Sequence, residues 1–307
     1  FLIGLLVFGL LTRRLARLTG DVRSFTDADF DVKAITPLES GALAPAGDGD
    51  EISQLRSAFG RMANKIREQF ERLKETDRLR RELVSNVSHD LRTPLASMHG
   101  YVETLLIKND SLSVDERRHY LEITRKHTKR LGQLIGDLFE LSKLDAASVH
   151  PDLELFSLAE LLQDVAQEFE LEAQKKDISI GIDAEPEASS VYADIGLMQR
   201  VLENLIRNAL KYTPAGGSIN IMLDKKPGSV TVAVEDTGCG IAEKDLERVF
   251  DRFYRSEQDD DEASNSAGLG LAIVRKILDL HGSRITVTSE VNQGTRFEFA
   301  LPTRKAA

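Results

Sequence analysis

The residues best suited to chemistry lie in a few short blocks of this 307-residue chain. The first block reads Ser-His-Asp-Leu-Arg-Thr-Pro from position 88, so that His89 stands directly before Asp90. Asp90 can hold one imidazole nitrogen, which leaves the lone pair of the other free for attack. Thr93 follows four residues after His89 and shares its face on a helix. A His-Asp pair on a helix is most often a solvated surface, so this block needs support from the rest of the chain.

A second block runs from Asn204 to Tyr212 and places Asn204, Asn208 and Lys211 on one stripe of a helix. Asparagines are unfavourable inside a helix that otherwise buries leucine and isoleucine. Their amide oxygens are hard donors suited to Mg²⁺, and Lys211 can meet phosphates as a point charge. The alternative is a polar face turned to solvent.

Two glycine-rich turns complete the set. Asp236 continues the alternation of Val230, Val232 and Val234, so its carboxylate falls on a buried face and needs hydrogen-bond donors such as the amino group of adenine. The glycines of the turn that follows permit a close backbone approach. Gly268 and Gly270 open a helix, whose first N–H groups can hold a phosphate. Taken alone, each turn could be an ordinary glycine turn. The turn residues are Gly238, Gly240 and Ile241 in the first, and Gly268, Leu269, Gly270 and Leu271 in the second.

The net charge and the cysteine content exclude some classes of function. A net charge of −10 argues against a nucleic-acid binder, since phosphate backbones require a basic surface. The single cysteine, Cys239, excludes an internal disulfide and fits a reducing compartment.

The helical elements that would position His89 are predicted from 3-4 spacing. Apolar residues at 52, 55, 59, 62 and 66 form a heptad seam that a partner helix must cover. Pro94 predicts a kink just after His89, and this helix should end near Asn109. A capping box from Ser113 to Glu116 begins a second helix. The apolar face of this hairpin is too wide for one chain to bury, which predicts a dimeric four-helix bundle.

After a polar linker the pattern predicts an α+β domain. A second capping box, Ser157 to Glu160, begins a helix. Strand-like alternation is found at 178–182, 219–223, 230–234, 285–288 and 295–301, with helices between these segments.

The chain begins with eleven apolar or glycine residues, followed by Arg13, Arg14 and Arg17. This run is too short to span a bilayer, and its charges follow it rather than precede it as in a signal peptide. We interpret residues 1–11 as the end of a transmembrane helix with the arginines on the cytoplasmic side. Residues 12–75 resemble a HAMP domain, the signal relay of bacterial receptors.

Taken in order, the blocks resemble the conserved boxes of bacterial transmembrane sensor histidine kinases of two-component systems. The 248–255 segment resembles the F-box, and Gly294-Thr295 the final glycine box. The resemblance implies that His89 accepts the phosphoryl group, that Asp90 activates it, and that Thr93 positions water for removing phosphate from a partner aspartate. It implies charge compensation by Arg252 and Arg255, metal binding by Asn208 and Asn204, and a lid at 256–267. The ATP ligands would be Asn204, Asn208, Lys211, Tyr212, Asp236, Gly238, Gly240, Ile241, Gly268, Leu269, Gly270, Leu271 and Thr295.

The resemblance also implies the architecture. An all-α N-terminal part comprises the membrane segment (1–11), the HAMP-like coiled coil (12–75) and the phosphotransfer hairpin (76–146). A linker (147–156) leads to an α+β sandwich of Bergerat type (157–303), the ATP-binding fold shared with gyrase and Hsp90-type ATPases. Expected partners are a second copy of the chain, a response regulator and the bacterial cytoplasmic membrane, with ATP and Mg²⁺ as substrate and cofactor. Two alternatives stay open: a Bergerat ATPase with a dimerising arm, and a nucleotide-binding scaffold without phosphotransfer.

Overall fold

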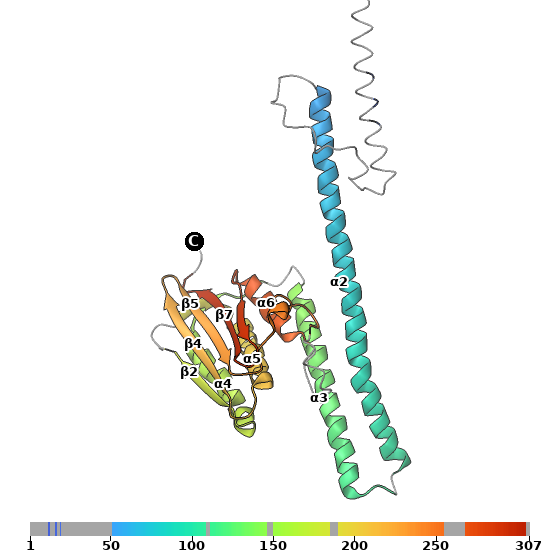
Figure 1. Cartoon of the computed structure of the whole chain (residues 1–307), viewed down its shortest axis with the longest axis vertical. Helices are drawn as coiled ribbons and strands as arrows, with labels where there is room; N and C mark the ends of the chain where they lie inside the picture. Colours follow the sequence, from blue (N-terminus) through green and yellow to red (C-terminus); the bar gives the residue numbers. More distant parts are fainter. Residues whose placement is uncertain are drawn as a thin grey trace, which may run out of the picture. The chain divides into compact units, whose positions relative to one another are not determined.

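The computed structural model describes Thr12, Ala16, Thr19 and residues 51–108, 111–145, 150–184, 190–254 and 268–304 (Figure 1). The chain divides into two compact units, 1–85 and 86–307. In the described part, no helix is both long and apolar enough to cross a membrane. The membrane segment predicted at 1–11 lies outside the described residues, as does most of the first half of the HAMP-like segment.

Helix α2 spans Glu51–Ile107 and continues as a helix through Pro94, which is buried. In the first unit Ala63 is fully buried, with Phe59 and Ile66 packed against it. Met62, predicted in the same seam, is half exposed. Ala63 is not one of the predicted heptad positions, and a seam covered by a partner helix stays a prediction.

Helix α3 spans Val114–Asp145 and begins with the predicted capping box. The Ser113 backbone N–H donates to the Glu116 carboxylate at 2.9 Å, and the Glu116 N–H donates to the Ser113 hydroxyl at 3.2 Å. Together the two bonds satisfy donors that a helix start leaves unpaired.

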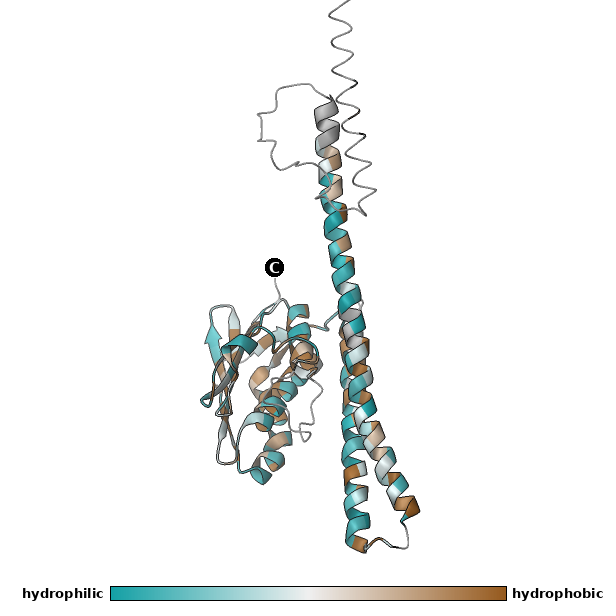
Figure 2. Cartoon of the chain, turned by 45° about the vertical axis from the view of Figure 1, so that its right-hand side comes forward, coloured by the Kyte–Doolittle hydropathy of each residue, from teal (hydrophilic) through white to brown (hydrophobic). Residues whose placement is uncertain are grey.

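The second half of α2 and helix α3 form an antiparallel hairpin. The Thr128 hydroxyl lies 3.1 Å from the sulfur of Met98, and the rings of Tyr101 and Tyr120 stack with centroids 5.5 Å apart. Figure 2 shows hydrophobic positions along both helices. Apolar side chains repeat at heptad-like spacing on the surface of the hairpin and remain largely exposed: Leu95, Val102 and Leu106 on α2, and Val114, Leu121, Ile135 and Phe139 on α3.

A five-stranded sheet with the order β2-β4-β5-β7-β6 forms the centre of the C-terminal domain. Its strands are β2 (Ser179–Asp183), β4 (Ser218–Lys226), β5 (Ser229–Asp236), β6 (Thr286–Glu290) and β7 (Gly294–Pro302). Among these five described strands β2 and β4 pair in parallel, and the other neighbouring pairs are antiparallel. Helices α4 (Leu158–Lys175), α5 (Ile195–Tyr212) and α6 (Gly270–Leu280) lie on one side of the sheet (Figure 1). A short 3₁₀ helix, η3 (Glu243–Asp245), follows β5.

All five predicted strands are confirmed, and Ser157 caps α4 as predicted, accepting from the Glu160 N–H. The alternation pattern missed two short strands, β1 (Glu154–Ser157) and β3 (Ser190–Ala193), which pair with each other to form a separate two-stranded sheet. Four residues are too few for an alternation to stand out.

The end of α3 packs into the core of this domain. Leu134, Leu141 and Leu144 are buried in the same cluster as the apolar residues of α5 and α6. At the edge of this contact, Arg200 of α5 forms ion pairs with Glu140 and, at 4.0 Å, with Asp137. Burial is the largest influence on Asp137 and raises the pKa of its carboxyl group. The unit 86–307 is therefore held together by both apolar packing and charge.

Candidate nucleotide and phosphoacceptor sites

Three polar residues form a row across the sheet. In the strand register Asp236 of β5 lies opposite Thr295 of β7, and Thr295 lies opposite Ser289 of β6. Directly opposed residues on neighbouring strands point to the same face of a sheet. Each residue stands at one end of an apolar alternation, so the row marks the polar end of the face that packs against the helices.

Asp236 is 6% exposed and has donors around it. The Gly238 backbone N–H donates to its Oδ1 at 2.8 Å, and the Thr295 N–H also donates to its carboxylate. Burial is the largest influence and raises the pKa of Asp236, while these two hydrogen bonds oppose it. A buried carboxylate needs partners, and the amino group of adenine has the complementary donors.

Helix α5 places Asn204, Asn208 and Lys211 on one half-buried stripe. Asp194 caps the helix by accepting from the Leu197 N–H. Asn204 donates through Nδ2 to the carbonyl of Arg200 at 2.8 Å, which leaves its oxygen as the outward group. That oxygen faces α6, because a Cβ added to Gly270 would lie only 2.8 Å from it. The structure thus brings the second block and the second glycine turn together.

The first glycine turn is joined to the end of α5. The Cys239 N–H donates to the carbonyl of Tyr212 at 3.2 Å, and a Cβ on Gly238 would lie 2.6 Å from the same oxygen. Glycine at 238 therefore permits an approach that a larger residue would prevent. Lys211 stays near this junction, with its Nζ 2.5 Å from the Tyr212 hydroxyl.

The F-box-like segment contacts the second glycine turn, since the Phe253 N–H donates to the carbonyl of Gly268 at 2.9 Å. Arg252, however, is engaged elsewhere: its guanidinium lies 2.8 Å from the carboxylate of Asp145 at the end of α3. Lys276 of α6 lies 3.5 Å from the same carboxylate. Arg255 and the lid predicted at 256–267 lie outside the described residues.

The first block stands on the surface of α2. The side chain of His89 is 80% exposed, and its Nδ1 lies 3.5 Å from Oδ1 of Asp90. The Thr93 hydroxyl donates to the carbonyl of His89 at 3.3 Å. Nε2 is thus the ring nitrogen that faces away from the neighbouring carboxylate.

The described residues fit a nucleotide with a hard metal ion better than a metal alone. Among them no group of three or more His, Cys, Asp and Glu residues could hold an ion. A Mg²⁺ ion here would take amide oxygens from the α5 stripe and its remaining ligands from phosphates and water. The Asn204 oxygen, which faces Gly270, and the Asn208 amide are the groups of this stripe that could bind such an ion.

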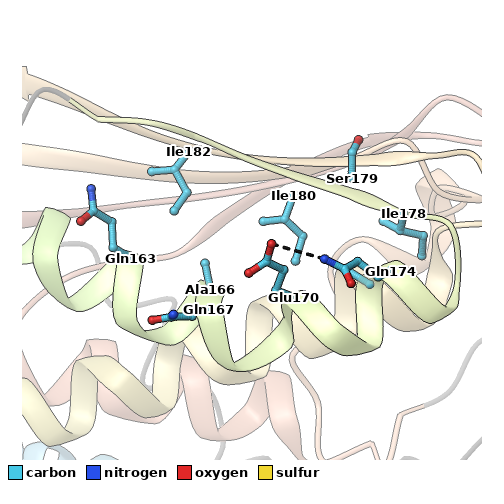
Figure 3. Close-up of a pocket in the computed structure, with 10 residues that line it drawn as sticks. Gln163, Ala166, Gln167, Glu170, Gln174, Ile178, Ser179, Ile180 and Ile182 are labelled. Atoms are coloured by element: carbon cyan, nitrogen blue, oxygen red, sulfur yellow. Dashed lines mark hydrogen bonds between the residues drawn. The ribbon is translucent and has the colours of Figure 1, made fainter.

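A cavity of about 430 Å³ lies away from these residues, between α4 and the edge strand β2 (Figure 3). Three glutamines and the apolar side chains of Ile180 and Ile182 line it, and Gln174 donates to Glu170 at 3.4 Å. None of the predicted site residues lines this cavity.

Ser289 is a residue of the row that the sequence pattern did not single out. Its hydroxyl contacts Ile241 of the first glycine turn, and both Gly294 and Thr295 of the last strand. A signal was available, because Ser289 continues the alternation of Ile285 and Val287 as Asp236 continues that of its own strand.

Comparison with known proteins matches the helical hairpin and the C-terminal domain to two known families. Residues 79–147 match the His Kinase A (phospho-acceptor) domain. Residues 193–305 match the family of histidine kinase-, DNA gyrase B-, and HSP90-like ATPases.

Two curated relatives illustrate the similarity. The sensor-like histidine kinase SenX3 of Mycolicibacterium smegmatis is 36% identical over 223 residues, covering 73% of this chain and 57% of the relative. The sensor histidine kinase WalK of Bacillus subtilis is 34% identical over 228 residues, covering 74% of this chain and 37% of the relative. The chain therefore spans little more than half, or less, of the length of these relatives.

Solved structures agree. Histidine kinase ThkA in complex with response regulator protein TrrA has a TM-score of 0.60 and 25% identity, covering 84% of this chain and 68% of that one. Full-length ShkA in complex with AMPPNP has a TM-score of 0.54 and 30% identity, covering 74% and 46%. With an exposed histidine on a helical hairpin and a buried aspartate, Asp236, in an ATPase-type domain, the chain belongs to the sensor histidine kinase family.

Proposed function

We propose that this chain is an ATP-dependent protein-histidine kinase that phosphorylates His89 and passes the phosphoryl group to an aspartate of a response regulator. The observation that carries the proposal is the solvent exposure of the His89 side chain. Its ring is open to solvent on the phosphoacceptor-type hairpin, and only its Nδ1 faces a carboxylate. The same polypeptide supplies a nucleotide domain whose buried Asp236 suits adenine.

The reaction follows from these positions. The lone pair of His89 Nε2 attacks the terminal phosphorus of ATP, the bond from that phosphorus to the bridging oxygen breaks, and ADP leaves. The Nδ1 proton of the phosphorylated ring is lost on the side of Asp90. Lys211 would offset charge on the phosphates. Mg²⁺, held by Asn208 and Asn204, would supply further charge neutralisation. Arg252 and Arg255 are proposed to act at the same stage.

A second copy of the chain is the proposed partner of the hairpin. The exposed apolar stripes recur at heptad-like spacing on both helices, as expected for two helices of a four-helix bundle. Isolated apolar residues on a surface need no explanation, but contiguous stripes of this kind mark an interface.

The proposed response regulator would dock on the hairpin beside His89 and Thr93. The solved complex of ThkA with its response regulator supports a partner of this class. Phosphatase activity towards the regulator is a further part of the proposal. It rests on Thr93, whose hydroxyl lies on the same face as His89 and could position water.

Membrane attachment and a HAMP-like relay are also proposed rather than observed. They rest on the apolar run at 1–11, the arginines that follow it and the heptad pattern after Asp50. The proposed location is the bacterial cytoplasmic membrane, with the described domains in the cytoplasm.

Incubation with γ-labelled ATP tests the central reaction. The chain should acquire acid-labile, alkali-stable label, and His89→Gln should abolish it while nucleotide binding stays within about twofold. His99→Gln is a matched control, because His99 lies on the same helix with 79% side-chain exposure; it should keep its label.

Asn208→Ala should also abolish labelling, but through lost Mg²⁺-nucleotide binding. An exposed asparagine on β4 provides the control substitution, Asn220→Ala. Steady ATP hydrolysis that leaves no label on the unmodified chain would contradict the proposal and favour an ATPase with a dimerising arm.

A further inference from the structure

The hydroxyl of Ser289 has three polar contacts beside Asp236 and Thr295. Its Oγ accepts from the Ile241 backbone N–H at 2.8 Å and donates to the carbonyl of Gly294 at 2.7 Å. It also lies 3.0 Å from the hydroxyl of Thr295. Ser289 thus joins the first glycine turn, the start of β7 and one residue of the polar row.

The protons of this cluster can be assigned by counting. A serine hydroxyl has one proton, and a carbonyl oxygen can only accept. The Ser289 proton is therefore used on Gly294, and the contact between the two hydroxyls requires Thr295 to be the donor. The Thr295 oxygen then has only lone pairs left for any other neighbour.

The strand register gives this polarity a consequence. Thr295 lies directly opposite Asp236, on the same face of the sheet, and is 7% exposed. Two acceptors, a carboxylate and an oriented hydroxyl oxygen, therefore stand side by side. An exocyclic amino group has two N–H donors and matches both, whereas a carbonyl at the same place would face lone pairs only.

We propose that Ser289 is a positioning residue for base selection. By accepting a hydrogen bond from the Thr295 hydroxyl, it orients the Thr295 oxygen as an acceptor, which favours the amino group of adenine over the carbonyl of guanine. This inference rests on the proposed ATP site. Ser289 itself need not touch the nucleotide. Without it the Thr295 hydroxyl could rotate and donate to a carbonyl, which would relax discrimination.

The test measures equilibrium binding of two non-hydrolysable analogues, adenylyl imidodiphosphate and guanylyl imidodiphosphate, to the full chain in the presence of Mg²⁺. Ser289→Ala should reduce the preference for adenine by about 3- to 10-fold, the equivalent of one neutral hydrogen bond. Ser283→Ala is the control, since Ser283 donates to the carbonyl of Ala300 at 2.7 Å next to the same strands. It should leave the preference unchanged.

Thr295→Val, which removes the hydroxyl but keeps the shape, separates base selection from a loss of packing. It should lower the preference by a similar factor, and adding Ser289→Ala to it should change the preference by less than about twofold, because coupled residues are not additive. Ser289→Cys, with a weaker donor, is the second variant should alanine destabilise the sheet; it should shift the preference in the same direction.

Equal weakening of both nucleotides in Ser289→Ala, with an unchanged ratio, would overturn the inference and leave Ser289 a structural role. Failure of the unmodified chain to bind the adenine nucleotide would overturn the proposed function, and this inference with it. The two failures are therefore distinguishable.

Discussion

Asp236 and Thr295, the proposed adenine-binding residues of the five-stranded domain, are enclosed, whereas His89 on the helical hairpin is exposed to solvent. Asp236 and Thr295 are less than a tenth exposed and have partners from three strands, while the side chain of His89 is four-fifths exposed and has its Nδ1 3.5 Å from the carboxylate of Asp90. The apolar side chains show the same difference. Those of the sheet domain form a closed core, and those of the hairpin include exposed stripes.

The difference indicates which parts of the reaction one chain can prepare alone. A nucleotide site benefits from donors and acceptors that are fixed before the ligand arrives. A phosphoacceptor must instead be reachable by a catalytic domain and later by a second protein. The described adenine-binding residues are therefore already arranged within one chain, whereas the hairpin leaves both its histidine and its apolar stripes exposed.

The largest expected effect comes from the enclosed region. Asp236→Asn should weaken ATP binding by about 100-fold, because a hydrogen bond to a buried charged group is lost. Asp224→Asn is the control, since Asp224 lies on β4 with 70% of its side chain exposed. Calorimetric titration measures both; near-normal affinity in Asp236→Asn would contradict the assignment.

Asp236→Asn, which should weaken ATP binding, should stabilise the nucleotide-free fold. Burial raises the pKa of Asp236 above its ordinary value of 3.8, so the folded chain holds this proton to higher pH than the unfolded chain does. That contribution to stability is present at low pH and is lost as the pH rises through the raised pKa. At neutral pH Asp236→Asn should therefore raise the Tm of the nucleotide-free domain, whereas a lowered Tm would show that the carboxylate is stabilising.

A smaller effect is expected from breaking the exposed region. Leu121→Glu places a charge in the apolar stripe of α3 and should weaken the dimer by roughly tenfold or more, since an unpaired charge is costly to bury. ATP affinity should stay within about twofold. Lys126→Glu introduces the same side chain on the same helix outside the stripe, with an even larger change of charge, and should leave the dimer intact. Light scattering after size exclusion reports the mass of each variant, and an unchanged dimer in Leu121→Glu would exclude this stripe from the interface.

The smallest effect concerns the contact between the two regions. Asp145 pairs with Arg252, the arginine proposed to offset charge on the phosphates. Asp145→Asn should release Arg252 and raise the rate of His89 labelling by about two- to fivefold, in keeping with the strength of an exposed ion pair. Asp152→Asn, which removes an exposed carboxylate within the linker, is the control. A rate that falls on releasing Arg252 would show instead that the pairing positions the domain productively.

Local patterns predicted much of this structure because their causes are local. The capping box of α3 depends on two residues three apart, and each strand of the large sheet on an alternation within its own segment. Asp236 could be singled out for the same reason, as a polar residue ending an apolar alternation.

Other features depend on tertiary packing and could not be predicted in this way. The strands β1 and β3 are four residues each, and each is stabilised by a partner more than 30 residues away. The proximity of Asn204 to Gly270 comes from the packing of α5 against α6. The contacts of Ser289 depend on the register of three neighbouring strands, and the ion pair of Arg252 depends on the position of Asp145 at the end of α3. Roles for Arg255 and for the HAMP-like segment stay predictions.

The most direct test of the central claim is to determine which atom carries the phosphoryl group after incubation with ATP. NMR spectroscopy of the labelled chain, kept at neutral or alkaline pH, distinguishes phosphate on the two imidazole nitrogens. Because Nδ1 of His89 faces Asp90, we expect a single phosphohistidine substituted at Nε2, absent from His89→Gln and retained in His99→Gln. Phosphate on Nδ1, on another residue or on none would contradict the account.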